Sequence, residues 1–342
     1  MFRNSTIRQV VHIALLIVLL AVSPAVFAGG SGEAGEEGPM VLTYAENTSD
    51  VDPITQGAKH FGELVFEYTD GRYAVEVLAG GQLGQPKATQ LAVQTGTLEM
   101  ARTNTFFMQE FGAEVMGLIG LPFIFQDSDH AWNVMKGPIG EEIIEEINGL
   151  DLGITVLGFY IAPPRSFFFT DAVVTSTSDM RGLNIRVPAG PLADAVTAFG
   201  GSATPVDFSE LYSALQTGVV DGAEQPVKGF FNEGFYEISK NFTFTNHQVD
   251  PAPVFINTEL WESMTAADQE AFKRAFSESQ DFYRELEETE RAQYMIELER
   301  DHGVTFYEVD DPNEWVSAVQ HLYDEASVGY EDLLARIQAA AE

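Results

Sequence analysis

The sequence contains no cysteine and few basic residues. Without cysteine the chain can form neither a disulfide framework nor a thiolate nucleophile, so its stability must come from a buried core. Its 342 residues include 18 lysines and arginines against 52 aspartates and glutamates, a formal net charge of −34. Nucleic acids and anionic membranes are bound by basic patches, and this composition argues against both partners. The acidic excess indicates either adaptation to a saline habitat, where salt screens self-repulsion, or an ordinary acidic secreted protein.

Motifs for catalysis and metal binding are also missing. The chain has no G-x-S-x-G and no P-loop, and its six histidines (12, 60, 130, 247, 302 and 321) are scattered without metal-ligand spacing. Acid pairs such as Glu141-Glu142 are too frequent in this sequence to indicate a glycosidase. We therefore expect no enzyme activity, no metal and no cofactor.

The N-terminus has the pattern of a cleavable secretory signal. Arg3 and Arg8 form a basic region, Val10–Val22 is an apolar run, and Val26-Phe27-Ala28 supplies the small residues that a signal peptidase requires. The apolar run is shorter than the roughly 20 residues that a membrane-spanning helix needs. Residues 1–28 are predicted to be a signal peptide that directs the protein to the periplasm, and the Gly- and Glu-rich residues 29–39 a flexible N-terminus.

Alternating polarity marks a short strand around Arg186. In the run LNIRVP, the apolar residues at 183, 185 and 187 alternate with polar ones, and Pro188 is expected to end the strand. Arg186 would then lie at the carboxyl end of a strand, where open α/β sheets bind ligands. Its planar guanidinium matches a carboxylate in two hydrogen bonds, although a surface ion pair is the ordinary alternative.

Two further arginines follow predicted strands. Arg102 comes after a short strand at Leu98–Ala101, and Arg165 follows a buried strand at Leu152–Tyr160 and two prolines. The ordinary alternatives are loop ion pairs, with Glu99 or Glu110 for Arg102 and with Asp171 or Asp179 for Arg165.

Several ordered motifs give the chain its resemblance to a known family. They are GQLG (81–84), LPFIF (121–125), RGLNIRVP (181–188), TPVDFSELYSALQTGVVDGAEQP (204–226) and TNH (245–247). Together they resemble the DctP-type solute-binding subunit of TRAP transporters (tripartite ATP-independent periplasmic transporters), over almost the whole chain that follows the signal. The run ALQTGVVDG is the most specific part.

The resemblance implies a ligand site and its members. It implies that Arg186 anchors the carboxylate of an organic acid, that Phe208 packs on the ligand, and that Gln225 stands where the family usually has a ligand-binding asparagine. The complete expected site consists of Arg186, Arg165, Arg102, Gln225, Phe208, Asn104, Glu46, Asn47 and Glu224. Glutamine is one methylene longer than asparagine, so the resemblance at this position does not by itself identify the ligand.

The expected fold class is α/β, a two-lobed periplasmic binding protein fold with mixed sheets, hinge strands and a long bracing helix. A strand (40–45), a helix from Pro53 and a strand (73–78) predict a βαβ unit with a parallel pair, and Thr265–Asp268 starts a helix that we expect to run to His302. A short strand is expected at Val219-Val220, and a final helix from Pro312 to about Ala341. Residues 40–162 with 251–290 are assigned to lobe I, and 163–250 with 291–342 to lobe II.

The resemblance therefore implies an extracytoplasmic, monomeric solute-binding subunit. Its expected partners are a small organic acid and the small and large membrane subunits of a TRAP permease, with no nucleic acid. A monocarboxylate with several hydroxyls, such as a hexuronate, is the preferred ligand, and a four-carbon dicarboxylate is the alternative. A secreted hydrolase of acidic sugars and a sensor lobe that docks to a receptor are the competing classes.

Overall fold

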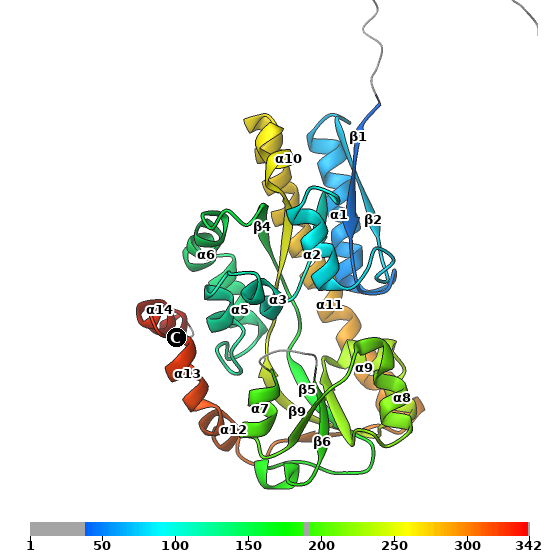
Figure 1. Ribbon diagram of the computed structural model, residues 1–342. Coiled ribbons are helices and arrows are strands. Elements are labelled where there is room, and N and C mark those ends of the chain that lie inside the picture. The colour runs from blue at the N-terminus through cyan, green and yellow to red at the C-terminus, as the bar shows by residue number, and fades with distance from the viewer. Residues whose placement is uncertain (1–37, 188–191, 341–342) are drawn as a thin grey trace, which may run out of the picture. The chain divides into compact units, whose positions relative to one another are not determined.

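The structure is a computed structural model that describes residues 38–187 and 192–340. The expected signal peptide, most of the segment 29–39, and Pro188 lie outside these residues. From residue 39 onward, the helices and strands form two groups, each built on one β-sheet, which we call the first lobe and the second lobe (Figure 1). This mixed α/β architecture is the fold class that the sequence predicts.

The first lobe contains a five-stranded sheet with the order β2-β1-β3-β10-β4. Its strands are β1 (Met40–Ala45), β2 (Tyr73–Leu78), β3 (Met100–Arg102), β4 (Ile154–Ile161) and β10 (Pro251–Asn257). Its helices are α1 (Pro53–Tyr68), α2 (Pro86–Gln94), α3 (Thr105–Glu110), α4 (Val115–Ile119), α5 (Ser128–Met135), α6 (Pro138–Asn148) and α10 (Thr258–Ser263). Strands β1 and β2 pair in parallel on either side of α1 in the sequence, which confirms the predicted βαβ unit.

The second lobe contains a six-stranded sheet with the order β11-β9-β5-β8-β6-β7. Its strands are β5 (Arg165–Phe169), β6 (Asn184–Val187), β7 (Ser202–Pro205), β8 (Gly222–Gln225), β9 (Asn241–Gln248) and β11 (Thr305–Glu308). Its helices are α7 (Leu192–Ala198), α8 (Leu211–Gln216), α9 (Val227–Asn232) and α12 (Pro312–Ala318). Strand β6 runs parallel to β7 and β8, whereas β5 is antiparallel to β8 and β9, so the sheet is mixed.

The long helix α11 (Ala266–His302) contacts both lobes. It starts at Thr265, whose hydroxyl accepts a hydrogen bond from the Asp268 amide, and it ends at Gly303 in the left-handed conformation, as the sequence predicts. It packs on α1 and β4 in the first lobe and on α9 in the second (Figure 1). Its close approach to β4 depends on Gly158, where a Cβ atom would lie 2.5 Å from the Phe276 ring. The helix thus braces the two lobes along one side.

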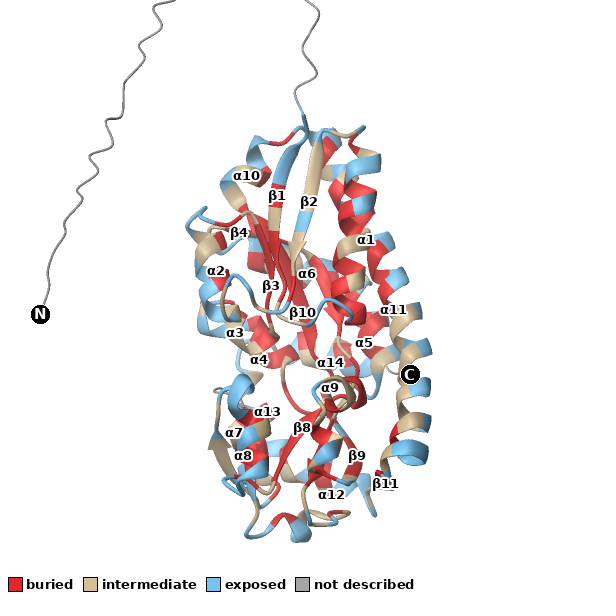
Figure 2. Ribbon diagram, turned by 90° about the vertical axis from the view of Figure 1, so that its right-hand side faces the viewer, coloured by how far each residue is buried: buried red, intermediate tan, exposed pale blue. Residues whose placement is uncertain are grey.

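Burial follows the sheets, as Figure 2 shows by the red colour of most central strands. All seven residues of β10 are buried, because this strand lies between β3 and β4 and is covered by helices. Helices α1 and α11 are amphipathic, with buried residues toward the sheets and exposed residues outside. Among the described residues, none of the helices combines the length and the apolar character needed to cross a membrane.

Two local predictions are wrong. The expected strand at Val219-Val220 is absent, because both amides donate to the Ala214 carbonyl and close the end of α8. The expected helix from Pro312 to about Ala341 is instead three helices: α12, α13 (Gln320–Ala326) and α14 (Glu331–Ala339). The chain turns before α14 at Gly329, which has φ 86°.

The last two helices contact the first lobe, whereas the expected boundaries assign 291–342 to lobe II. The Tyr323 hydroxyl donates to the Pro122 carbonyl at 2.6 Å, and Arg336 forms a bidentate pair with Glu142 on α6. Helices α13 and α14 therefore return to α4 and α6, where they bury the apolar side chains of Leu333 and Ile337.

Candidate ligand-binding site

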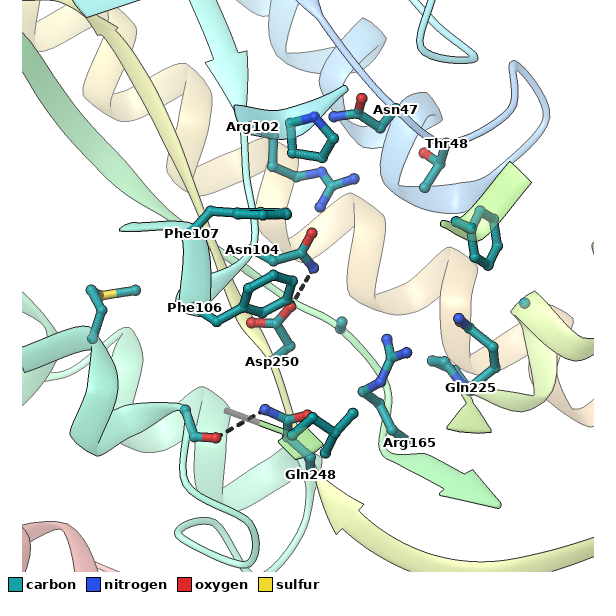
Figure 3. Close-up of a pocket in the computed structure, with 18 of the residues that line it drawn as sticks. Asn47, Thr48, Arg102, Asn104, Phe106, Phe107, Arg165, Gln225, Gln248 and Asp250 are labelled. Atoms are coloured by element: carbon teal, nitrogen blue, oxygen red, sulfur yellow. Dashed lines mark hydrogen bonds between the residues drawn. The ribbon is translucent and has the colours of Figure 1, made fainter. Parts of the chain in front are cut away.

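A cavity of about 1250 Å³ is lined by side chains from both lobes (Figure 3). Seven of the nine expected site residues line it: Asn47, Arg102 and Asn104 from the first lobe, and Arg165, Arg186, Phe208 and Gln225 from the second. Glu46 and Glu224 do not line the cavity. Each is buried behind an arginine, where it acts on that arginine and not directly on the cavity.

Arg102 is paired with Glu46 in the first lobe. Arg102 is the last residue of β3, one position later than the predicted strand end, and Glu46 directly follows β1, the neighbouring strand. Its Nε lies 2.8 Å from Glu46 Oε2 and its Nη2 lies 2.5 Å from Oε1. Burial alone would raise the pKa of Glu46, but the guanidinium and hydrogen bonds from Thr48 and Asn47 hold it below its usual range. Glu46 is therefore ionised and compensates the charge of Arg102.

Arg165 is paired with Glu224 in the second lobe. Arg165 follows β4 and the two prolines, as predicted, and is also the first residue of β5. Glu224 lies on the adjacent antiparallel strand β8. Both Nε and Nη2 donate to the Glu224 carboxylate, the latter at 2.8 Å. The surface partners that the sequence offered for Arg102 and Arg165 are not used, since both arginines pair with buried carboxylates behind the cavity.

His247 lies beneath this second pair. Its ring stacks on Phe167, its Nδ1 is 2.9 Å from the Thr245 hydroxyl, and its Nε2 is 3.9 Å from Glu224 Oε2. Burial, helped by the nearby Arg165 charge, lowers the pKa of His247 to about 3. Because the His247 imidazole is neutral, it does not compete with Arg165 for Glu224, and Glu224 compensates the charge of Arg165.

Arg186 has no carboxylate of its own among the described residues. Its side chain forms a hydrogen bond from Nε to the Val206 carbonyl at 2.8 Å, and its guanidinium carbon lies 5.7 Å from the centre of the Phe208 ring. The four neighbouring residues that the structure does not describe, 188–191, are Pro-Ala-Gly-Pro and carry no acid. Burial lowers the pKa of Arg186 to about 10, so it remains protonated at neutral pH.

The remaining expected residues supply amides and an aromatic ring. Asn104 donates from Nδ2 to Asp250 Oδ2 at 2.5 Å, which fixes the side chain at the start of α3. Gln225 lies at the end of β8, where a Cβ atom on Gly229 would come within 2.9 Å of its Oε1. The longer amide that replaces the family asparagine thus fits against the first turn of α9 because residue 229 is glycine. Phe208 is partly exposed at the cavity wall.

An ion pair that the sequence did not predict joins the lobes. Lys228 on α9 donates to Asp52 at the start of α1 at 2.9 Å, both side chains are buried, and Lys228 Nζ lies 5.9 Å from the Tyr283 ring on α11. All three residues line the cavity. The lysine within the otherwise apolar run VKGFF indicates a buried charge that needs a partner. The sequence does not identify that partner, because it lies 176 residues away.

The family comparison matches residues 44–328 to the DctP model, described as bacterial extracellular solute-binding protein, family 7, and the chain belongs to this family. It is 29% identical to the C4-dicarboxylate-binding periplasmic protein DctP of Rhodobacter capsulatus, over 89% of this chain and 92% of that protein. It is 31% identical to a solute-binding protein of Chromohalobacter salexigens, over 80% of each. The chain spans only 49% of an uncharacterised Sinorhizobium fredii protein to which it is 30% identical.

Solved TRAP periplasmic solute-binding proteins share the fold. A protein from Pseudomonas putida F1 with bound D-glucuronate has a TM-score of 0.83 at 28% identity, covering 88% of this chain and 97% of that one. A protein from Xanthobacter autotrophicus Py2 with bound β-D-galacturonate has a TM-score of 0.82 at 27% identity, covering 87% and 99%. The family predicted from the sequence motifs is thereby confirmed.

Proposed function

We propose that this protein is the extracytoplasmic solute-binding subunit of a TRAP transporter and that it captures a sugar acid, with a hexuronate as the preferred ligand. The observation that carries the proposal is the state of Arg186, a buried cation in the cavity wall without a carboxylate partner of its own among the described residues. A ligand carboxylate would supply the missing counter-charge in two parallel hydrogen bonds. The glucuronate and galacturonate complexes of similar structures support this ligand class.

The other cavity residues would contact the carbon skeleton and the hydroxyl groups of the ligand. Phe208 offers its ring beside the carboxylate position, and Gln225 and Asn47 offer amides from opposite lobes.

A ligand held by both lobes stabilises the arrangement in which the lobes face each other. Binding therefore shifts the protein toward a closed form about the crossing strands and α11. Small-angle scattering should show a smaller radius of gyration at saturating ligand, and an unchanged radius would contradict the hinge.

The partners follow from the family. The signal-like N-terminus and the family description favour a periplasmic protein that hands its ligand to the small and large permease subunits in the membrane. We propose that it acts as a monomer and without catalysis. Overnight incubation with the ligand should return it unchanged, whereas enzyme-dependent product detected by mass spectrometry would favour the hydrolase.

A thermal-shift screen of organic acids tests the ligand class. The panel should contain D-glucuronate, D-galacturonate, succinate and, as neutral controls, glucose and galactose. Binding stabilises the folded protein by RT ln(1 + [L]/Kd), roughly 4 kcal/mol at a thousandfold excess over Kd, so a true ligand is readily detected. Hexuronates should give the largest shifts. A larger shift with succinate would favour the dicarboxylate alternative, which the Rhodobacter capsulatus relative keeps open. Shifts with neutral sugars alone would refute the proposal.

A further inference from the structure

The arginines that line the cavity differ in how much of their charge is available to a ligand. Arg102 and Arg165 each form two hydrogen bonds with a buried carboxylate, whereas Arg186 is bonded through Nε to a backbone carbonyl. Lys228, a further cation in the cavity wall, is paired with Asp52. Among the described residues of the wall, Arg186 is therefore the buried cation that a ligand carboxylate would neutralise.

The Arg102–Glu46 ion pair is buried and is held in place by additional hydrogen bonds to the carboxylate. Glu46 is 1% exposed and Arg102 6% exposed. Glu46 Oε1 also accepts hydrogen bonds from the backbone amides of Asn47 (2.7 Å) and Thr48 (3.0 Å) and from the Thr48 hydroxyl (3.2 Å). These donors fix the carboxylate at the end of β1 as an anion, so Arg102 cannot be released to a second anion without leaving Glu46 buried and uncompensated.

Arg102 nevertheless keeps hydrogen-bonding capacity toward the cavity. A guanidinium has five N–H donors, and Glu46 takes one from Nε and one from Nη2. The remaining donors suit neutral acceptors such as sugar hydroxyls. In Figure 3, Arg102 approaches the cavity from the first lobe and Arg165 approaches it from the opposite side.

We infer that Glu46 is a specificity-determining residue that restricts the site to sugar acids with one carboxylate and rejects those with a carboxylate at both ends. The inference rests on the proposed function and extends it. Arg186 lines the cavity from the second lobe and Arg102 lines it from the first. An acid of the aldarate type, held at one end by Arg186 and extended across the cavity, would bring its second carboxylate toward the Arg102–Glu46 pair, whose net charge is zero. That carboxylate would lose its hydration without gaining a counter-charge.

The test compares D-galacturonate with galactarate, which has the same six-carbon chain and a second carboxylate. Calorimetric titration of the wild-type protein should show galacturonate bound at least about tenfold more tightly. The Glu46→Gln variant keeps the side-chain shape but removes the charge that holds Arg102. Its preference should move toward galactarate by about ten- to a hundredfold, the effect of a hydrogen-bonded charge.

Two further variants separate the release of Arg102 from a general change in charge. The double variant Glu46→Gln/Arg102→Gln should return the preference to near the wild-type value, because the gain requires the arginine. Glu142→Gln removes a carboxylate outside the cavity wall, one that pairs with Arg336 at the surface, and should leave the preference unchanged. An equal shift with Glu142→Gln would overturn the inference.

The outcomes for the two proposals are distinguishable. Wild-type protein that binds both acids within about threefold of each other would refute the role of Glu46 while leaving the proposed function intact. A folded Glu46→Gln variant with the wild-type preference for galacturonate over galactarate would also refute the role of Glu46. Wild-type protein that binds neither acid would refute the proposed function and this inference with it. If Glu46→Gln fails to fold, Glu46→Asp takes its place: it keeps the charge but shortens the reach to Arg102, and it should move the preference in the same direction.

Discussion

At the scale of single residues, the strongest expectation concerns Arg186. Replacing it with alanine should weaken sugar-acid binding by about 2–5 kcal/mol, or roughly 30- to several-thousand-fold in Kd, because the ligand carboxylate would be buried unpaired. Arg186→Lys should also fail, since an ammonium lacks the planar fork. Calorimetric titration measures both variants.

The matched control for Arg186 is Arg181→Ala. Arg181 is exposed and is absent from the cavity wall, and its loss should change Kd by less than about twofold. A Kd for Arg186→Ala within about threefold of wild type would mean that this arginine is not the carboxylate anchor.

Glu46 gives a prediction for stability against pH. Its pKa is lowered in the folded protein, so its contribution is complete above the ordinary pKa of 4.5 and is lost as the pH falls through the folded value. At neutral pH, Glu46→Gln should lower the free energy of unfolding by about 3–5 kcal/mol, because Arg102 remains buried without its partner. Below pH 4.5 the difference from wild type should shrink. Denaturant unfolding across this range measures it, and a difference that grows on acidification would contradict the assignment.

At the scale of elements, α1 of the first lobe and α9 of the second are joined by Asp52 and Lys228. Asp52 also caps α1 by accepting from the Ile54 amide at 2.9 Å. Asparagine caps a helix as well as aspartate does, so Asp52→Asn removes the charge of the pair and keeps the cap. If the lobes close on the ligand, this variant should weaken the binding of every ligand by about ten- to a hundredfold without changing preference, since it disfavours closure itself.

The control for the pair between the lobes is Lys59→Met. Lys59 pairs with Asp50 at 2.6 Å in the same region, but that pair is exposed and lies within the first lobe. Its loss should change Kd by less than about twofold. An Asp52→Asn variant that alters the ranking of ligands, or leaves all affinities unchanged, would show that the pair does not act on closure.

At the scale of the whole molecule, the net charge of −34 should make stability depend on salt. Raising NaCl from about 0.1 to 1 M shortens the screening length from about 10 to about 3 Å and weakens repulsion among the acids. We expect the unfolding temperature to rise by at least about 5 °C. Sucrose at matched osmolality controls for solute exclusion. A fall in unfolding temperature with NaCl would contradict the prediction.

Local signals in the sequence predicted those elements whose determinants are neighbours in the chain. The strands at 40–45 and 73–78 and the helices from Pro53 and Thr265 were found because side-chain alternation, an apolar stripe and helix caps act over a few residues. The predicted strand at Val219-Val220 was wrong because two valines suggest a strand, whereas their amides close the end of α8. The strand propensity of valine does not decide the structure where the backbone amides form hydrogen bonds outside a sheet.

By itself, the sequence determined the two-lobed α/β class, the family and seven of the residues that line the cavity, since each follows from local pattern or from ordered motifs. Only the tertiary structure decided which arginine is available to a ligand. The pairs Arg102–Glu46, Arg165–Glu224 and Lys228–Asp52 join residues 56, 59 and 176 positions apart. No local pattern encodes these pairings, because a charge acts through space on whichever group the fold places within a few ångströms and shields from water.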